Sequence, residues 1–146
     1  MDKKYLYYGS EFVDVKPISD EYPGINNPRD LYDALTGIWC AQTCAPGMRA
    51  NWTPENMTLG QCSITSFLAQ EIFGGKVYGL PLEDGNYHCF NDVSGAVFDL
   101  TSEQFGGKEL DYANRTEQFR EDHFINEEKR LRFEHLKKEL FKATHR

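Results

Sequence analysis

The most informative segment of the chain is residues 59–70, which read Leu59-Gly60-Gln61-Cys62-Ser63-Ile64-Thr65-Ser66-Phe67-Leu68-Ala69-Gln70. A turn at Gly60 is followed by apolar side chains at helical spacing, which predicts a helix from Cys62 to about Phe73, stopped by Gly74-Gly75. A thiol in the first turn of a helix lies among unpaired backbone N–H groups at the positive end of the helix dipole. That setting lowers the pKa of a thiol, so Cys62 is a candidate nucleophile.

A histidine and an aspartate follow on a predicted hairpin. After a first strand at 76–80, residues 87–92 and 96–101 have strand composition and flank a turn at Ser94-Gly95. A two-residue or a four-residue loop puts His88 and Asp99 on one face, whereas a three-residue loop separates them. Cys62, His88 and Asp99 would then supply a nucleophile, its base and the carboxylate that orients the base.

Other side chains are weaker candidates for the same site. Asn91 is an alternative to Asp99 as the orienting group, but its odd spacing from His88 turns it to the other face of a regular strand. The backbone N–H of Cys62, with the side-chain amide of Gln61, is a candidate oxyanion site. Trp52 stands in the loop 45–60, where it either lines a substrate pocket or fixes the loop to the core.

A structural interpretation of the trio stays open beside the catalytic one. Cys62 would be a small buried residue, His88 a core histidine with its hydrogen bonds satisfied, and Asp99 a cap for the turn at 101–104. The remaining cysteines, Cys40, Cys44 and Cys89, are interpreted as buried apolar residues. A zinc site from Cys40, Cys44, His88 and Cys89 is an alternative, although neither pair has the usual ligand spacing. We expect no metal and no cofactor.

Length, composition and charge limit the possible partners, location and number of domains. The chain has 146 residues and a net charge of −7, which argues against nucleic acid and anionic membranes as partners. It has neither a membrane-spanning apolar run nor the apolar core of a signal peptide, which predicts a cytoplasmic protein with reduced thiols. We expect one domain over 1–146, with a core at 28–107 and a charged helical extension at 112–146.

Further elements are predicted by local signals. Residues 11–15 alternate like a short strand. Asn27 and Pro28 start a helix that should end near residues 41–44, with Trp39 as a core anchor. Residues 101–105 should form a short capped turn, and the charged segment from Arg115 onward one or two helices.

Several of these motifs resemble the YunG-like family of uncharacterised bacterial proteins. The resemblance rests on Gly60-Gln61-Cys62-Ser63-Ile64-Thr65, on Gly74-Gly75, on a His-bearing strand with Asn91, on Trp39 and Trp52, and on Phe98-Asp99-Leu100-Thr101-Ser102-Glu103-Gln104-Phe105. It covers residues 31–107 and leaves the charged segment after Gly107 outside. The family in turn resembles the papain-like and transglutaminase-like cysteine superfamily. This implies an α+β core in which a Cys-bearing helix packs on a small antiparallel sheet, with Cys62, His88 and Asp99 as the triad.

The leading functional hypothesis is a cysteine-dependent acyl-transfer enzyme of peptidase, amidase or deamidase type, or a transferase. Its substrate would be an amide or ester of a small molecule or peptide. The alternative is a non-catalytic binding or interaction module on the same fold, with Trp52 and the N-terminal tyrosines lining a ligand groove. The sequence selects neither a substrate nor an oligomeric state.

Overall fold

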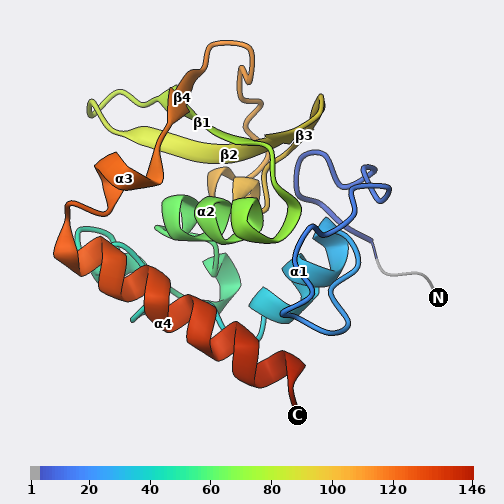
Figure 1. Ribbon diagram of the computed structural model, residues 1–146. Coiled ribbons are helices and arrows are strands. Elements are labelled where there is room, and N and C mark those ends of the chain that lie inside the picture. Colours follow the sequence, from blue (N-terminus) through green and yellow to red (C-terminus); the bar gives the residue numbers. More distant parts are fainter. Residues whose placement is uncertain (1–3) are drawn as a thin grey trace.

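The computed structural model describes residues 4–146 and shows an α+β arrangement in three layers (Figure 1). The first layer is an antiparallel sheet of order β3-β2-β1-β4. Helix α2 covers one face of the sheet, and α4 lies on the far side of α2 (Figure 1). The strands are β1 (Lys76–Pro81), β2 (Tyr87–Val93), β3 (Ala96–Phe98) and β4 (Thr116–Gln118). The helices are α1 (Pro28–Leu35), α2 (Cys62–Phe73), α3 (Arg120–His123) and α4 (Glu127–Thr144), with 3₁₀ turns at Arg49–Asn51, Pro54–Asn56 and Ser102–Phe105.

Helix α2 has the bounds predicted from the sequence. Its apolar side chains, including Ile64, Phe67 and Leu68, are fully buried. Thr65, Ser66 and Ala69 on its other sides are buried as well, because the helix is enclosed by the sheet and by α4. Gly74 ends it with a φ of 81°, a conformation that glycine adopts without strain. Cys62 is thereby held at the start of the most enclosed helix of the described chain.

The hairpin takes the two-residue loop that was one of the two predicted registers. Asn91 pairs with Phe98 and Val93 with Ala96, and the loop residues Ser94 and Gly95 have φ angles of 52° and 91°. Both central residues at positive φ match a type I′ turn. Strand β3 stops at Phe98, so the outer edge of β2 from Tyr87 to Phe90 has no β3 residue paired with it.

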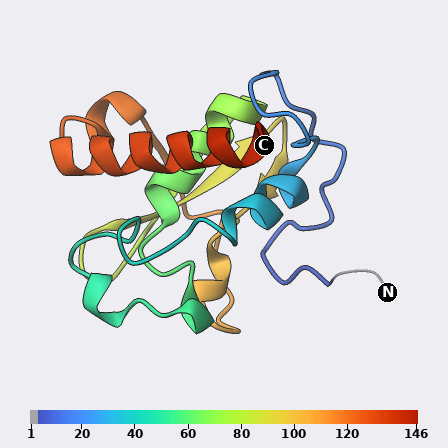
Figure 2. The same cartoon turned by 90° about the horizontal axis from the view of Figure 1, so that it is seen from below.

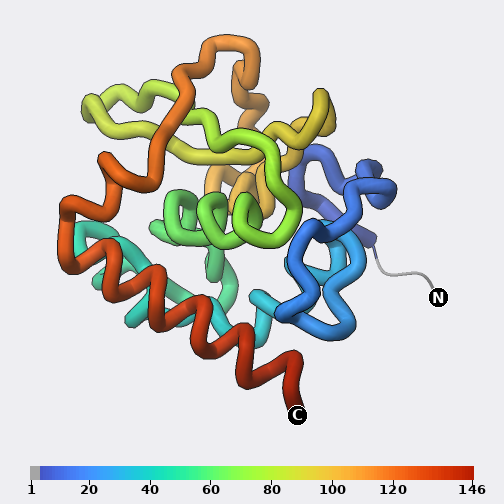
Figure 3. The backbone as a smooth tube through the Cα atoms, in the orientation of Figure 1, coloured from blue at the N-terminus to red at the C-terminus, as the bar shows by residue number. Residues whose placement is uncertain are grey.

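The N-terminal segment pairs with the chain directly after the end of β3. Asp99 donates its backbone N–H to the carbonyl oxygen of Tyr8 at 2.9 Å, and Tyr8 donates its own N–H to the Ser102 hydroxyl at 2.9 Å. Figure 3 shows this segment running beside the end of the β2–β3 hairpin. The predicted strand at 11–15 is wrong, since these residues form no strand. The segment contributes one bridge, and that bridge fixes the backbone of Asp99.

Helix α1 begins as predicted but is shorter. The Asn27 side chain accepts the N–H of Asp30 at 3.0 Å and caps the helix. The predicted end near residues 41–44 is wrong, because α1 ends at Leu35 and the chain enters turns at Thr36 and Gly37. This break lets Trp39 enter the core, where its indole N–H donates to the Thr65 hydroxyl at 3.0 Å. The prediction of Trp39 as a core anchor is confirmed.

The segment after residue 112 differs most from expectation. It is not wholly helical, since β4 pairs with β1 in the register Val77 to Gln118. Helix α4 crosses under α2 (Figure 2), and Phe133, Leu136 and Leu140 are buried in the same cluster as the α2 side chains. The segment thus completes both the sheet and the core. No helix within residues 4–146 is long and apolar enough to cross a membrane.

Candidate functional site

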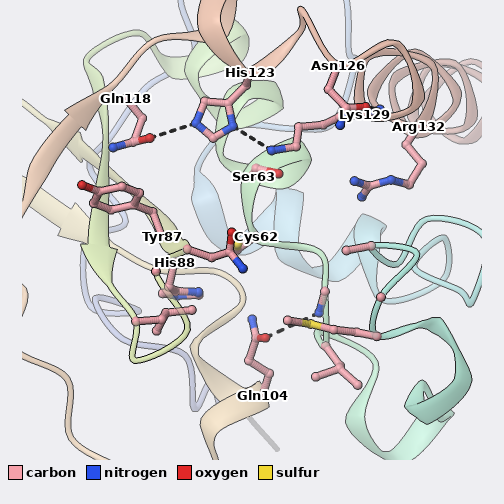
Figure 4. Close-up of a pocket in the computed structure, with 18 of the residues that line it drawn as sticks. Cys62, Ser63, Tyr87, His88, Gln104, Gln118, His123, Asn126, Lys129 and Arg132 are labelled. Carbon is pink, nitrogen blue, oxygen red and sulfur yellow. Dashed lines mark hydrogen bonds between the residues drawn. The ribbon is translucent and has the colours of Figure 1, made fainter.

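Cys62 lies on a cavity of about 810 Å³ (Figure 4). It is partly exposed, as the first residue of α2. The preceding Gln61 makes no side-chain cap, so the N–H groups of the first turn receive no side-chain acceptor from it. The backbone donors that favour an anion at a helix start therefore remain open beside the sulfur.

His88 and Asp99 form a buried pair next to this cavity. The His88 Nε2 lies 2.6 Å from Asp99 Oδ2, and both side chains are 1% exposed. Tyr112 donates its hydroxyl to the same oxygen at 2.8 Å, and Thr101 donates its backbone N–H to Asp99 Oδ1 at 3.2 Å. Burial and the Asp99 carboxylate raise the pKa of Tyr112, so its hydroxyl stays a donor. The carboxylate is therefore fixed from several sides while it holds the imidazole.

Cys62 lies within hydrogen-bonding reach of the unpaired edge of β2. The Cys89 thiol, the His88 ring and the Cys89 backbone N–H lie beside its sulfur and act on its pKa. The Cys89 thiol, followed by His88, lowers the pKa of Cys62 well below its usual range, against the opposing effect of burial. A strand paired along the whole of β2 would use the outward N–H groups of β2 for sheet hydrogen bonds. Because β3 ends at Phe98, the N–H of Cys89 is left beside the Cys62 sulfur.

The surroundings of His88 favour the protonated, cationic form of its ring. Burial alone would lower its pKa, but the Asp99 carboxylate and the Cys62 sulfur together raise it to about 10. Nε2 is engaged by Asp99, and the Cys62 sulfur adjoins the same ring. The ring edge also packs on Phe105, with centroids 4.7 Å apart. Together these shifts favour a thiolate–imidazolium pair at neutral pH.

Comparison with known proteins identifies the family of the chain. The family model described as "YunG protein" matches residues 27–145. The chain belongs to the YunG family. A relative in Bacillus subtilis (strain 168), named "Uncharacterized protein YunG", is 38% identical over 56 residues, which are 38% of this chain and 48% of that protein. The chain thus matches about half the length of this curated relative, and no solved structure matches it.

The YunG match corrects the extent of the resemblance. The sequence motifs covered residues 31–107 and left the charged segment outside, whereas the family model continues to residue 145. The structure gives the physical reason, because Tyr112 contacts Asp99 and α4 supplies part of the cavity wall. The C-terminal third is therefore part of the family's architecture.

Three predicted pocket residues lie elsewhere. The Gln61 amide donates to the Cys40 carbonyl oxygen at 3.1 Å, and the Asn91 amide to the Ser66 carbonyl oxygen at 2.9 Å. Trp52 donates its indole N–H to the Met57 carbonyl oxygen at 2.9 Å and fixes its own loop. None of the three is among the residues that line the cavity. Their hydrogen bonds hold α2 and the preceding loop in place.

Other residues in or next to the cavity were not predicted as part of the site. Cys89 and Tyr112 contact the trio, and Gln104 lies on the wall opposite α4. His123 and Lys129 come from the charged segment after Arg115, which had been predicted only as one or two helices. Cys89 adjoins His88 in sequence and carried a usable signal, whereas the position of Tyr112 depends on how the loop 106–115 crosses the sheet.

The described residues offer no alternative metal centre. No group of three or more His, Cys, Asp or Glu side chains within residues 4–146 is arranged to hold a metal ion. Cys44 is buried beside Gly60, and burial raises the pKa of its thiol. The interpretation of Cys44 and Cys89 as buried residues is confirmed, while Cys40 is partly exposed.

Proposed function

We propose that this YunG-family chain is a cysteine-dependent acyl-transfer enzyme, with Cys62 as nucleophile, His88 as proton carrier and Asp99 as the group that orients His88. The observation that carries the proposal is the buried His88–Asp99 pair, 2.6 Å apart, whose ring adjoins a cysteine on an open cavity. A histidine serving only the core would have no need of a thiol on a cavity beside its ring. This arrangement supplies the three roles that cysteine catalysis requires.

The proposed reaction has two steps. The Cys62 thiolate attacks the carbonyl carbon of an amide or ester, forming a C–S bond while the carbonyl electron pair moves to oxygen. The intermediate then collapses, the bond to the leaving group breaks, and the His88 imidazolium gives that group its proton. In the second step His88 takes a proton from water or an amine, which attacks the thioester and returns the thiolate.

The open N–H groups of the first α2 turn support the charge that develops on oxygen. The backbone N–H of Cys62 belongs to this turn, and Gln61 does not cap it. Backbone donors fixed in this way act without reorganisation. We therefore assign the oxyanion role to the backbone and not to the Gln61 side chain, whose amide is bonded to Cys40.

The proposal extends to the class of fold. A helix that carries the cysteine at its start and packs on a small antiparallel sheet bearing the histidine has the general plan of the papain-like and transglutaminase-like superfamily. The packing of α2 against β2 supports this assignment. The reaction would then be that of a peptidase, amidase, deamidase or acyltransferase.

Acylation of Cys62 by p-nitrophenyl acetate tests the proposal without knowledge of the natural substrate. The wild type should release p-nitrophenolate in a burst and carry one acetyl group on the Cys62 peptide in mass spectra. Cys62→Ala should lose both signals, and His88→Ala should slow the burst. Cys40→Ala is the matched control, since Cys40 is a partly exposed thiol outside the cavity. A burst that survives Cys62→Ala at the wild-type rate contradicts the proposal.

A further inference from the structure

The cavity is chemically two-sided. The loop 45–60 and Leu82 contribute apolar side chains, including Met48 and Leu59. The opposite wall is formed by residues 118–132 and is polar, with Gln118, His123 and Lys129 turned toward the cavity (Figure 4). Cys62 and His88 lie between these walls. A bound molecule would therefore present different groups to the two sides.

Lys129 is fixed in place by uncharged neighbours. Its Nζ lies 2.9 Å from His123 Nδ1, and His123 Nε2 lies 2.9 Å from Gln118 Oε1. Burial, together with the nearby Lys129 ammonium, lowers the pKa of His123, so the ring is neutral and accepts from lysine while donating to glutamine. The chain of hydrogen bonds directs the ammonium without neutralising it.

The ammonium of Lys129 has no acidic partner. Within residues 4–146 no carboxylate oxygen lies within 4.0 Å of its Nζ. Arg132 on the same wall is already committed, since its Nε donates to Glu128 at 2.8 Å and one terminal nitrogen to the Thr43 carbonyl oxygen at 3.1 Å. Asp122 also lines this wall but is exposed, so water screens its charge more than that of the partly buried Lys129.

A cation in the first turn of a helix is unfavourable, because the helix dipole is positive there. Lys129 occupies this position in α4, where its own backbone N–H donates to the capping Asn126 at 3.0 Å. Glu127 and Glu128 of the same turn are exposed and do not line the cavity, so an anion bound in the cavity would be stabilised by the Lys129 ammonium. A single ammonium suits a singly charged carboxylate, whereas phosphate recognition favours the forked donors of an arginine, which Arg132 has committed elsewhere.

We propose that Lys129 is a specificity residue that binds a carboxylate of the substrate, so that Cys62 acts on amides or esters of carboxylate-bearing molecules. The carboxylate lies against the α4 wall, and the hydrocarbon part lies against Met48 and Leu59. This inference rests on the proposed function, because it takes Cys62 as the attacking group.

The test compares two alkylating agents that differ in charge. Iodoacetate and neutral iodoacetamide both react as the sulfur forms a bond to carbon and iodide leaves, so the ratio of their rates at Cys62 does not depend on the thiolate fraction. The wild type should show a higher iodoacetate-to-iodoacetamide ratio than the urea-unfolded chain. Lys129→Gln should lower that ratio by about three- to tenfold, the range expected for one partly screened charged hydrogen bond.

Two further variants complete the test. Lys129→Arg keeps the charge and should retain most of the ratio, and Lys138→Gln, an exposed lysine of the same helix outside this cavity, should leave it unchanged. A ratio that is the same in wild type and Lys129→Gln overturns the carboxylate assignment, while Cys62 stays a reactive thiol. A Cys62 that reacts with neither reagent until unfolding overturns the proposed function itself, and the carboxylate assignment with it.

Discussion

Replacing Asp99 with asparagine removes the negative charge 2.6 Å from the His88 ring while keeping the side-chain shape. In the wild type that charge is a main reason why the pKa of His88 is about 10 despite burial. Without it we expect the pKa of His88 to fall toward the ordinary histidine value of about 6.5, because burial is then opposed only by the smaller effect of the Cys62 sulfur. At pH 8 the protonated fraction of His88 would decrease from nearly all to about 3%, a change of about 30-fold.

The consequence should be measurable at Cys62. A thiol without an imidazolium neighbour loses one of the influences that lower its pKa, so the pKa of Cys62 should rise and its thiolate fraction at pH 7 should fall. Iodoacetamide alkylation of the Cys62 peptide, followed by mass spectrometry at pH 7, should therefore be about tenfold slower in Asp99→Asn for each unit by which the pKa of Cys62 rises above 7. The wild-type rate should be nearly flat from pH 6 to 9, whereas the variant rate should rise with pH over this range.

Asp92→Asn is the matched control. Asp92 lies on the same hairpin, pairs with Arg115 at 2.9 Å and does not line the cavity, so its loss should leave the alkylation rate unchanged. Far-UV circular dichroism of Asp99→Asn checks that the fold is retained. A folded Asp99→Asn protein that is alkylated at the wild-type rate at pH 7 would show that the Cys62 thiolate does not depend on this carboxylate.

Three further predictions concern the contacts of Cys62 and the packing of α4. Cys89→Ala removes the thiol that lowers the pKa of Cys62 most, so this pKa should rise and alkylation at pH 6 should slow. Cys62→Ser should make the free energy of unfolding fall between pH 6.5 and 8.5 relative to wild type, by up to about 3 kcal/mol in urea titrations. Leu136→Ala should lower the free energy of unfolding by about 3 kcal/mol, while Leu131→Ala, at 51% exposure on the same helix, should change it by less than about 0.5 kcal/mol.

The sign of the Cys62→Ser effect comes from counting protons. Between pH 6.5 and 8.5 the folded wild type holds one proton on His88 and none on Cys62, and the unfolded chain holds one on the thiol and none on the imidazole. These contributions cancel. In Cys62→Ser the folded state still holds the His88 proton that the unfolded state has lost, so stability decreases as pH rises. Parallel pH profiles for the two proteins would contradict the ion pair.

The Cys89→Ala and Leu136→Ala results have their own contrary outcomes. An unchanged pH profile for Cys89→Ala would mean that the backbone N–H of residue 89 and His88 suffice to hold the thiolate. Equal losses for Leu136→Ala and Leu131→Ala would mean that α4 is not docked through its buried face.

Helix α2 and the hairpin were predictable because their signals are local. The glycines after Phe73 stop the helix, and the Ser94-Gly95 turn fixes the register that puts Asp99 diagonal to His88. Contacts between distant segments carried no such signal. The bridge from Tyr8 to Asp99 and the Tyr112 hydroxyl join residues 91 and 13 positions apart, and neither belongs to a repeating pattern.

The charged C-terminal segment shows the same limit. Its charge and its lack of Pro and Gly predicted α4, but β4 is a short strand at a sheet edge, where pairing with β1 overrides weak local preference. Lys129 carried no signal of a site, because its partner His123 comes from α3 and the cavity that both side chains line is formed by segments far apart in the sequence. Composition shows that the segment is charged but does not show which of its charged side chains face the cavity.

The ionisation state of Cys62 can be measured on the folded protein. The ultraviolet thiolate absorbance of wild type minus that of Cys62→Ala should be titrated with pH on the folded protein. We predict that the thiolate signal is already present at pH 6, where an ordinary thiol with a pKa of about 8.5 would give almost none. A signal that appears only with a midpoint at or above about 8.5 would contradict the thiolate–imidazolium pair and the proposed function built on it.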